Sequence, residues 1–175
     1  MLIIFEGLDK SGKSTMANML QQHKHAIMIK KTYNKQLYPI DYSKASVYDW
    51  QAILDRVILP NKDLMFIADR SFLTQTAYQV CLGHGEHAIT EEQTAMYNNY
   101  CEVVKTMPHL VVYCTSKRYE LDSMVTNLRT RAKLNDLYID LLKQSGMHHL
   151  ILDMDNATMH DNYNKILTTI KQFAE

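Results

Sequence analysis

The feature that most restricts how this chain can fold is a short glycine-containing segment near its N-terminus. Residues 5–15 read Phe-Glu-Gly-Leu-Asp-Lys-Ser-Gly-Lys-Ser-Thr. Gly7, Gly12, Lys13 and Ser14 match the pattern G-x-x-x-x-G-K-[ST]. In this pattern the glycines let consecutive backbone N–H groups turn toward phosphate oxygens, the lysine reaches the terminal phosphates, and the hydroxyl coordinates Mg²⁺. The segment therefore predicts a phosphate-binding loop.

The residues on either side of the loop support this interpretation. Residues 2–5 form an apolar run suited to a buried parallel strand, and Thr15–Leu20 reads as a helix with Met16, Met19 and Leu20 on one face. A strand, a glycine loop and a helix N-terminus together form an anion-binding site. We expect this site to bind phosphate groups together with Mg²⁺, through Gly7, Lys10, Ser11, Gly12, Lys13, Ser14 and Thr15.

Length, charge and cysteine usage narrow the class of protein. The chain has 175 residues, and its 19 basic and 19 acidic residues balance to a net charge of zero, which argues against stable binding of long nucleic acids. Cys81, Cys101 and Cys114 are widely spaced and form no C-x-x-C pair, which is typical of reduced cytosolic thiols. A first strand starting at residue 2 leaves no room for a signal peptide, and no apolar run is long enough to span a membrane. We expect a cytoplasmic protein (in the host cytoplasm if its source is viral).

Strands and helices are predicted to alternate along the chain. The predicted strands are residues 2–5, 26–29, 64–68, 110–114 and 150–152. The predicted helices are residues 15–20, 48–59 ending before Pro60, 74–82, 90–107 opening on a Thr90–Gln93 capping box, 134–143 and 162–173. This order predicts a single α/β domain over residues 1–175, with a five-stranded parallel sheet between two layers of helices. Ligands are then expected beyond the carboxyl ends of the strands.

Asp69 and Arg70 directly follow the third predicted strand, at the edge that carries the phosphate-binding loop. An acidic residue at this point is typical of the Walker-B position, which holds Mg²⁺ or one of its waters. The simpler reading is that Asp69 caps the next helix. Arg70 offers a planar pair of donors suited to a second phosphate.

These motifs resemble those of the thymidylate kinase family. Residues 5–15 are similar to the opening of its members, including a viral branch with lysine where Lys10 stands, and Asp69-Arg70 followed by Thr74 and Ala77-Tyr78-Gln79 is similar to its Asp-Arg-Tyr segment. The likeness is close over residues 2–20 and 64–82 and recognisable to residue 114. It implies a P-loop kinase fold with a short lid at about residues 116–135.

The resemblance also implies roles for individual residues. Lys13 and Ser14 would serve ATP and Mg²⁺, and Asp69 would support the metal. Arg70 would bind the monophosphate of an acceptor nucleotide, most simply dTMP, and Asp9 would meet its sugar near the 3′ hydroxyl. The residues that would approach the acceptor base or sugar are Thr74, Gln75 and Tyr78. The helices at residues 74–82 and 90–107 would pair across a homodimer as in the family, or cover a monomer core.

The departures from the family fall on recognition of the acceptor. The phenylalanine and arginine that contact thymine in the family are replaced by Ala45 and Asp49, so stacking on the base falls to Trp50, Tyr42 or Tyr48. The tyrosine of Asp-Arg-Tyr is Ser71, as in the Glu-Arg-Ser segment of deoxynucleoside kinases.

The predicted lid contains Arg129 and Arg131, which would stabilise the phosphoryl group in transfer. Residues two apart diverge on a helix, so both can converge on one phosphate only if this segment is a loop. A solvated helix face is the simpler reading of these charges.

The sequence also has to be compared with functions other than phosphorylation of a nucleoside monophosphate. A deoxynucleoside kinase would need a carboxylate near the 5′ hydroxyl, and Glu6 or Asp9 would have to supply it. A kinase of a modified or polymer-borne nucleotide has the same motifs. A GTPase-like switch needs N-K-x-D after a strand, whereas residues 61–64 precede one. A non-catalytic nucleotide-binding protein would not need Arg70 or the lid arginines.

Overall fold

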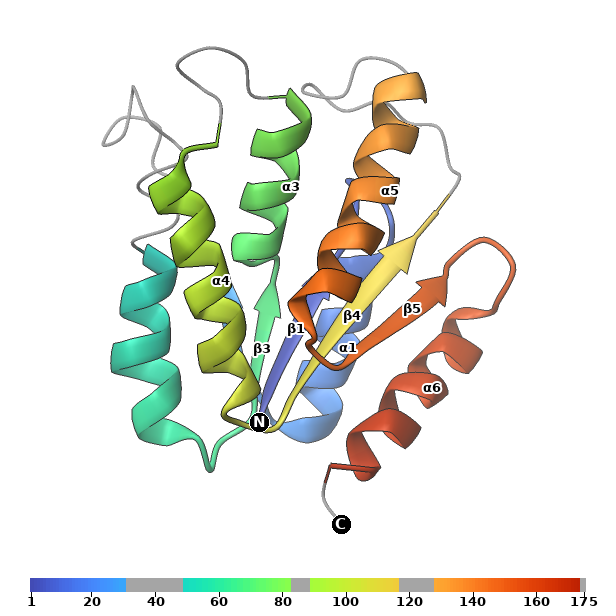
Figure 1. Cartoon of the computed structure of the whole chain (residues 1–175). Coiled ribbons are helices and arrows are strands. Elements are labelled where there is room, and N and C mark those ends of the chain that lie inside the picture. Colours follow the sequence, from blue (N-terminus) through green and yellow to red (C-terminus); the bar gives the residue numbers. More distant parts are fainter. Residues whose placement is uncertain (31–48, 83–88, 117–127, 174–175) are drawn as a thin grey trace.

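The computed structural model describes residues 1–30, 49–82, 89–116 and 128–173, and within these ranges it contains one five-stranded parallel sheet. The strands lie in the order β2-β3-β1-β4-β5 and all adjacent pairs are parallel (Figure 1). Their bounds are β1 Leu2–Glu6, β2 Ile27–Lys30, β3 Phe66–Asp69, β4 His109–Thr115 and β5 His149–Asp153. The predicted sheet is confirmed, with strand ends within two residues of those expected.

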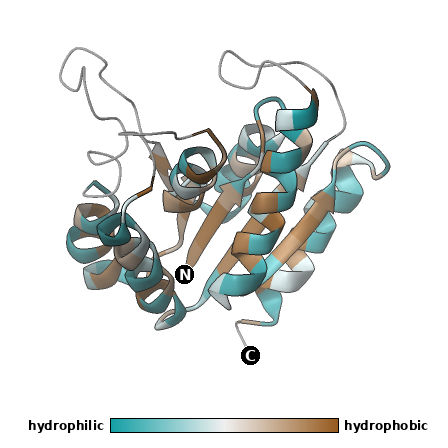
Figure 2. Cartoon of the chain, turned by 45° about the horizontal axis from the view of Figure 1, so that its top comes forward, coloured by the Kyte–Doolittle hydropathy of each residue, from teal (hydrophilic) through white to brown (hydrophobic). Residues whose placement is uncertain are grey.

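Helices cover both faces of the sheet, so the predicted three-layer α/β architecture is confirmed. One face packs against α1 (Lys13–Lys24) and α6 (Met159–Lys171). The other face packs against α3 (Phe72–Leu82), α4 (Glu91–Lys105) and α5 (Leu128–Ser145). Figure 2 shows that the strands are mostly hydrophobic, whereas the helices carry both hydrophilic and hydrophobic residues.

The two apolar faces of the sheet follow from the alternation of side chains along a strand. Leu2 and Ile4 of β1 belong to the core beneath α3, α4 and α5, whereas Ile3 and Phe5 belong to the core beneath α1 and α6. All four are fully buried. A strand buried on both faces must be apolar at every position, which explains why the strands read as continuous apolar runs.

The helical segment before β3 differs from the prediction. Residues 49–53 are α-helical, Leu54–Ile58 form a π-helical turn, and Leu59–Asn61 form a 3₁₀ turn. The helical run therefore continues two residues beyond the predicted end at Leu59, as a 3₁₀ turn. Pro60 lies at the start of the 3₁₀ turn, where a missing N–H costs no intrahelical hydrogen bond.

Local residue patterns mark the start of α4 and the end of α5. Thr90 accepts a hydrogen bond from the Gln93 backbone while the Gln93 side chain accepts one from the Thr90 backbone, so the predicted capping box of α4 is confirmed. α5 begins at Leu128, earlier than the predicted residue 134, so residues 128–135 of the expected lid are helical. Residues 117–127 of that lid lie outside the described ranges. Gly146, with φ of 66°, follows the end of α5 in the left-handed conformation.

The carboxyl ends of the three central strands meet at one edge of the sheet. Phe5 of β1 is paired with Asp69 of β3, and Glu6 is paired with Tyr113 of β4. The loop between β1 and α1 and the turn between β3 and α3 therefore start side by side (Figure 1). Among the described helices, none is long and apolar enough to cross a membrane.

Candidate active site

The loop between β1 and α1 has the backbone conformation that its glycines predict. Gly7 has φ of 140°, and a Cβ atom there would lie 2.4 Å from the carbonyl oxygen of Cys114 in β4. Gly12, with φ of 82°, is the N-cap of α1. Both positions require glycine, the first because of close approach and the second because of its left-handed backbone. The loop therefore turns at these points and leads into the N-terminus of a helix.

Lys13 lies folded over this loop. Its Nζ donates a hydrogen bond of 3.2 Å to the Leu8 carbonyl and lies 3.8 Å from Oδ1 of Asp9. Burial lowers the pKa of Lys13, while the charges of Asp69 and Glu6 act in the opposite direction. A buried ammonium held by a carbonyl and nearby carboxylates can exchange these partners for phosphate oxygens.

The other predicted phosphate-binding residues also lie in or beside the loop. The Ser11 hydroxyl is buried and has no hydrogen-bond partner among the described residues. Lys10 is exposed and has φ of 62°. Thr15 is exposed in the first turn of α1.

Ser14 and Asp69 are brought together as predicted for a metal site. The Ser14 hydroxyl donates a hydrogen bond of 2.6 Å to Oδ2 of Asp69, across the start of α1 and the end of β3. The second oxygen of Asp69, Oδ1, is buried and has no hydrogen-bond partner among the described residues. Hard oxygen donors with an unused lone pair, next to a phosphate-binding loop, fit Mg²⁺. The alternative, that Asp69 only caps a helix, does not fit, because the hydroxyl that caps α3 belongs to Ser71.

Arg70 contacts the loop through Asp9. An Arg70 Nη2–Asp9 Oδ1 ion pair joins the β3–α3 turn to the phosphate-binding loop, and the side chains of Arg70 and Asp9 are 27% and 44% exposed. Arg70 has φ of 73°, which is unusual for a residue other than glycine. Strained backbone of this kind collects at functional sites. The guanidinium lies beside the loop and remains accessible to an anion.

Glu6, at the end of β1, is fully buried, and both of its carboxylate oxygens accept hydrogen bonds. Its Oε1 accepts a hydrogen bond from the Ser71 hydroxyl and its Oε2 accepts one from the Thr74 hydroxyl. Burial raises the pKa of Glu6, and the two hydroxyls and the charge of Arg70 act against that rise. The option of Glu6 as a general base for a nucleoside hydroxyl is therefore wrong for this structure, because no face of its carboxylate reaches solvent. Asp9 is the exposed carboxylate.

The predicted acceptor-binding residues differ in how deeply they are buried. Thr74 and Gln75 lie half-buried near the start of α3, and Tyr78 packs partly against the core. Trp50 is 2% exposed and packs edge-on against the Phe72 ring. The prediction that Trp50 stacks on an acceptor base is therefore corrected, because its apolar ring is used in the core. Tyr42, Ala45 and Tyr48 lie outside the described residues.

Arg129 and Arg131 point away from each other. Both lie on α5, where Arg131 is 5% exposed and Arg129 is exposed. Of the two alternatives, a loop in which both converge on one phosphate and a helix on which they diverge, the structure has the helix, because both residues lie in α5. Nη1 of Arg131 has no hydrogen-bond partner among the described residues.

Arg131 borders a hollow of about 260 Å³ next to the phosphate-binding loop. The residues around it are Leu8, Thr115, Ser116, Leu128, Arg131, Ala132, Asn135 and Asp136. An inward-facing guanidinium with an unused donor provides a binding point for an anion on the α5 side of the loop.

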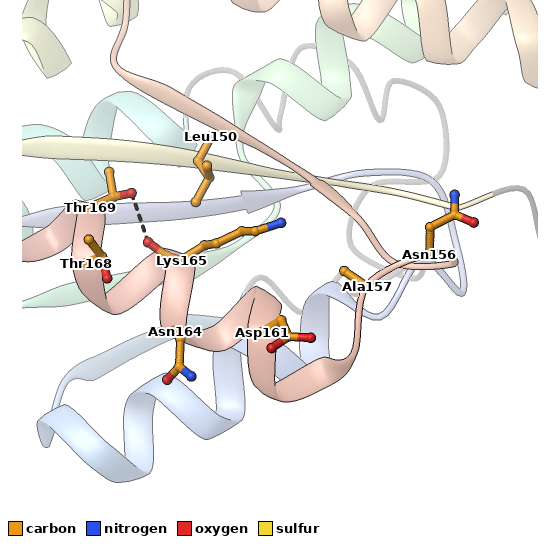
Figure 3. A pocket seen from close by; sticks show the side chains of 8 residues that line it. All are labelled: Leu150, Asn156, Ala157, Asp161, Asn164, Lys165, Thr168 and Thr169. Atoms are coloured by element: carbon orange, nitrogen blue, oxygen red, sulfur yellow. Dashed lines mark hydrogen bonds between the residues drawn. The ribbon is translucent and has the colours of Figure 1, made fainter.

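A second, more open hollow of about 650 Å³ lies over β5 and α6. Figure 3 shows that its side chains come from α6, the turn before it and Leu150 of β5. None of them belongs to the phosphate-binding loop or to the Asp69-Arg70 turn. The candidate active site is therefore the loop together with the smaller hollow.

Comparison with known proteins bears on the fold. No protein-family model matches the chain, and no curated protein matches it in sequence. Solved structures match it over nearly its whole length. The YorR protein of Bacillus subtilis, in complex with phosphorylated GDP, has a TM-score of 0.68 at 19% identity, covering 98% of this chain and 96% of that one.

Two kinases give similar values. Thymidylate kinase from Candida albicans has a TM-score of 0.62 at 21% identity, covering 98% of this chain and 91% of that one. Deoxyadenosine kinase from M. mycoides, with the products dCMP and dCDP, has a TM-score of 0.62 at 17% identity, covering 98% and 100%. The chain has the P-loop nucleotide kinase fold. At these identities the likeness extends to the kinase fold and not to an acceptor.

Some residues near the site are hard to identify from the sequence. Tyr138 of α5 donates a hydrogen bond of 2.9 Å to the Thr74 hydroxyl, and Tyr113 of β4 donates one of 2.8 Å to Asn135. Tyrosines at helical or strand spacing are indistinguishable from ordinary core residues. Ser71 carried one usable signal, its position directly after Asp69-Arg70.

Proposed function

We propose that this chain transfers the γ-phosphoryl group of ATP, with Mg²⁺, to the phosphate of a nucleoside monophosphate, with dTMP as the first acceptor to be tested. The observation that carries the proposal is the position of Arg70. Its guanidinium is accessible and is paired with Asp9 of the phosphate-binding loop. A protein that only binds ATP has no need of a second cation at this point.

The donor side would be organised by the loop. Backbone N–H groups of residues 7–14 and the Lys13 ammonium would hold the β- and γ-phosphates, and Ser14 and Asp69 would hold Mg²⁺. Mg²⁺ held by these two residues would supply positive charge that offsets part of the negative charge of the phosphates. Lys13 would leave the Leu8 carbonyl and follow the γ-phosphoryl group.

The acceptor side would be organised by Arg70 and Asp9. Arg70 would bind the acceptor phosphate with one of its oxygens in line with the γ-phosphorus. That oxygen forms the new P–O bond as the bond to the β–γ bridging oxygen breaks, which leaves ADP and a nucleoside diphosphate. An acceptor phosphate is already an anion, so the step needs no general base. Arg131 would stabilise the charge from the lid side.

A second candidate is phosphorylation of a deoxynucleoside at its 5′ hydroxyl. The half-exposed Asp9 favours it, because an accessible carboxylate can accept the hydroxyl proton. In that reaction Arg70 would orient Asp9 and would not bind a phosphate. The two functions therefore assign different partners to the same ion pair.

An ADP-formation assay with purified chain, ATP and Mg²⁺ separates them. The acceptors would be dTMP, dUMP, the other nucleoside monophosphates and the free deoxynucleosides. We expect turnover with a monophosphate, dTMP first. Turnover of thymidine without dTMP would establish the second candidate, and ATP binding without turnover of any acceptor would establish a non-catalytic nucleotide-binding protein.

A further inference from the structure

Glu6 is the centre of a buried chain of hydroxyl groups. Its two carboxylate oxygens accept hydrogen bonds from Ser71 and Thr74, and the residue is 0% exposed. It therefore touches neither the acceptor nor ATP. A buried carboxylate costs free energy unless it is well paired, so its presence at the end of β1 calls for a reason.

One branch of the chain holds the backbone of Arg70. The Arg70 N–H donates a hydrogen bond of 2.9 Å to the carbonyl of Phe5, the residue before Glu6. Ser71, the residue after Arg70, donates to Glu6 and accepts a hydrogen bond of 3.1 Å from the Leu73 N–H at the start of α3. The left-handed Arg70 is thus fixed to β1 on both sides. Strained backbone persists only where its surroundings hold it in this way.

The other branch holds α5. Tyr138 is fully buried and donates its hydrogen bond of 2.9 Å to the Thr74 hydroxyl, whose own hydrogen is directed at Glu6. Tyr138 lies seven residues after Arg131, so both are on the same buried face of α5. The register of α5 against α3 therefore depends on the same carboxylate.

The geometry points to Glu6 as a positioning residue that holds Arg70 through Ser71, and α5 through Thr74 and Tyr138, in the arrangement that binds the acceptor. This inference rests on the proposed phosphoryl transfer. It assigns Glu6 no contact with substrate. Its expected signature is a loss on the acceptor side with ATP binding retained.

Whether Glu6→Gln weakens or strengthens acceptor binding distinguishes a positioning role of Glu6 from a purely electrostatic one. Glu6 places a negative charge near Arg70 and Lys13. If only that charge mattered, Glu6→Gln would strengthen the binding of anionic acceptors. If Glu6 positions Arg70, the substitution weakens acceptor binding, because an amide nitrogen replaces one oxygen and cannot accept the hydroxyl hydrogen.

The test compares Glu6→Gln and Ser71→Ala with Thr76→Val as a matched control. Thr76 is also buried on α3, and in the described part of the chain its hydroxyl donates to the Phe72 carbonyl of the same helix, at 3.0 Å, and to no residue of the Glu6 chain. We expect both test variants to raise the acceptor KM by about tenfold, the scale of a lost hydrogen bond to a charged group. We expect the ATP Kd, measured without acceptor, to stay within about twofold. Thr76→Val should leave both constants within the same range.

A double variant and a folding check complete the design. If Glu6 acts on Arg70 through Ser71, the Glu6→Gln, Ser71→Ala double variant loses little more than either single variant. Thermal unfolding confirms that each variant is folded under assay conditions. If Glu6→Gln does not fold, the acceptor KM of Ser71→Ala is compared with that of Thr76→Val. This comparison tests the positioning role by itself.

Each outcome has one meaning. An acceptor KM that is unchanged or lowered in the folded test variants overturns the positioning role while leaving the proposed function in place. Equal losses of ATP and acceptor binding overturn it as well. A wild-type chain that turns over no acceptor removes the proposed function and this inference with it.

Discussion

Ser14 donates a hydrogen bond of 2.6 Å to Asp69, although 55 residues separate them in the chain. The contact joins the first turn of α1 to the carboxyl end of β3 and leaves Oδ1 of Asp69 buried without a partner among the described residues. The two oxygen groups that Mg²⁺ would need are therefore already adjacent. Packing of α1 against the sheet would therefore set the position of a bound Mg²⁺.

Asp69→Asn tests this arrangement. The amide keeps the size of the side chain but removes its charge, so Mg²⁺ should bind more weakly. We expect the Mg²⁺ concentration for half-maximal activity to rise by about tenfold or more. The measurement is a Mg²⁺ titration at saturating ATP, with the exposed Asp63→Asn as the control. An unchanged titration would remove Asp69 from the metal site.

Arg70→Ala tests the acceptor side. Loss of a guanidinium paired with a phosphate should raise the acceptor KM by about a hundredfold. The ATP Kd should change by less than about threefold, since Arg70 is not part of the loop. Steady-state kinetics and ATP titration measure the two effects. Arg56→Ala, at an exposed position before β3, is the matched control. Equal losses for ATP and acceptor would contradict the assigned role.

The two arginines of α5 provide an internal comparison. Arg131 faces the hollow beside the loop and Arg129 faces solvent. Arg131→Ala should lower kcat by about a hundredfold, the scale of removing one donor to developing charge, whereas Arg129→Ala should change it by less than about twofold. Single-turnover rates with dTMP measure this difference, and circular dichroism shows whether α5 is retained. A larger effect at Arg129 would contradict the role assigned to Arg131.

His109 should make the stability of the fold depend on pH. Its Nδ1 lies 2.8 Å from the Met107 carbonyl and its Nε2 accepts a hydrogen bond of 3.0 Å from the His148 N–H, which requires the neutral ring. Burial lowers the pKa of His109 from 6.5; the hydrogen bond to the Met107 carbonyl opposes this, and the nearby His148 and Lys105 add to it. The folded state thus binds fewer protons than the unfolded state below that value, and the free energy of unfolding falls as the pH drops through it.

Urea unfolding between about pH 5 and about pH 8 measures this dependence. His109→Gln should flatten the fall below pH 6.5, the unperturbed value, because the variant has no ring to protonate. His160→Gln, at an exposed position on α6, should leave it unchanged. The same slope in wild type and His109→Gln would assign the dependence to other groups.

Prediction from sequence worked where the signal is local. Gly7 and Gly12 mark the loop because their backbone conformations exclude other residues, and the Thr90–Gln93 capping box lies within one helical turn. Prediction was less successful for residues whose role depends on whether the folded chain buries them. Trp50 was expected at the acceptor but packs on Phe72, because an aromatic ring suits a core and a base-stacking surface equally well.

Sequence analysis alone identified the phosphate-binding loop, the order of strands and helices, and Asp69-Arg70 at the end of a strand. Each of these features depends on neighbouring residues and on their periodicity. The three-dimensional structure was needed to show that Arg131 borders the hollow and Arg129 does not, and that Glu6 is joined to Ser71 and Thr74, 65 and 68 residues away. Such contacts arise when separate elements pack together, and the local pattern of residues carries no information about them.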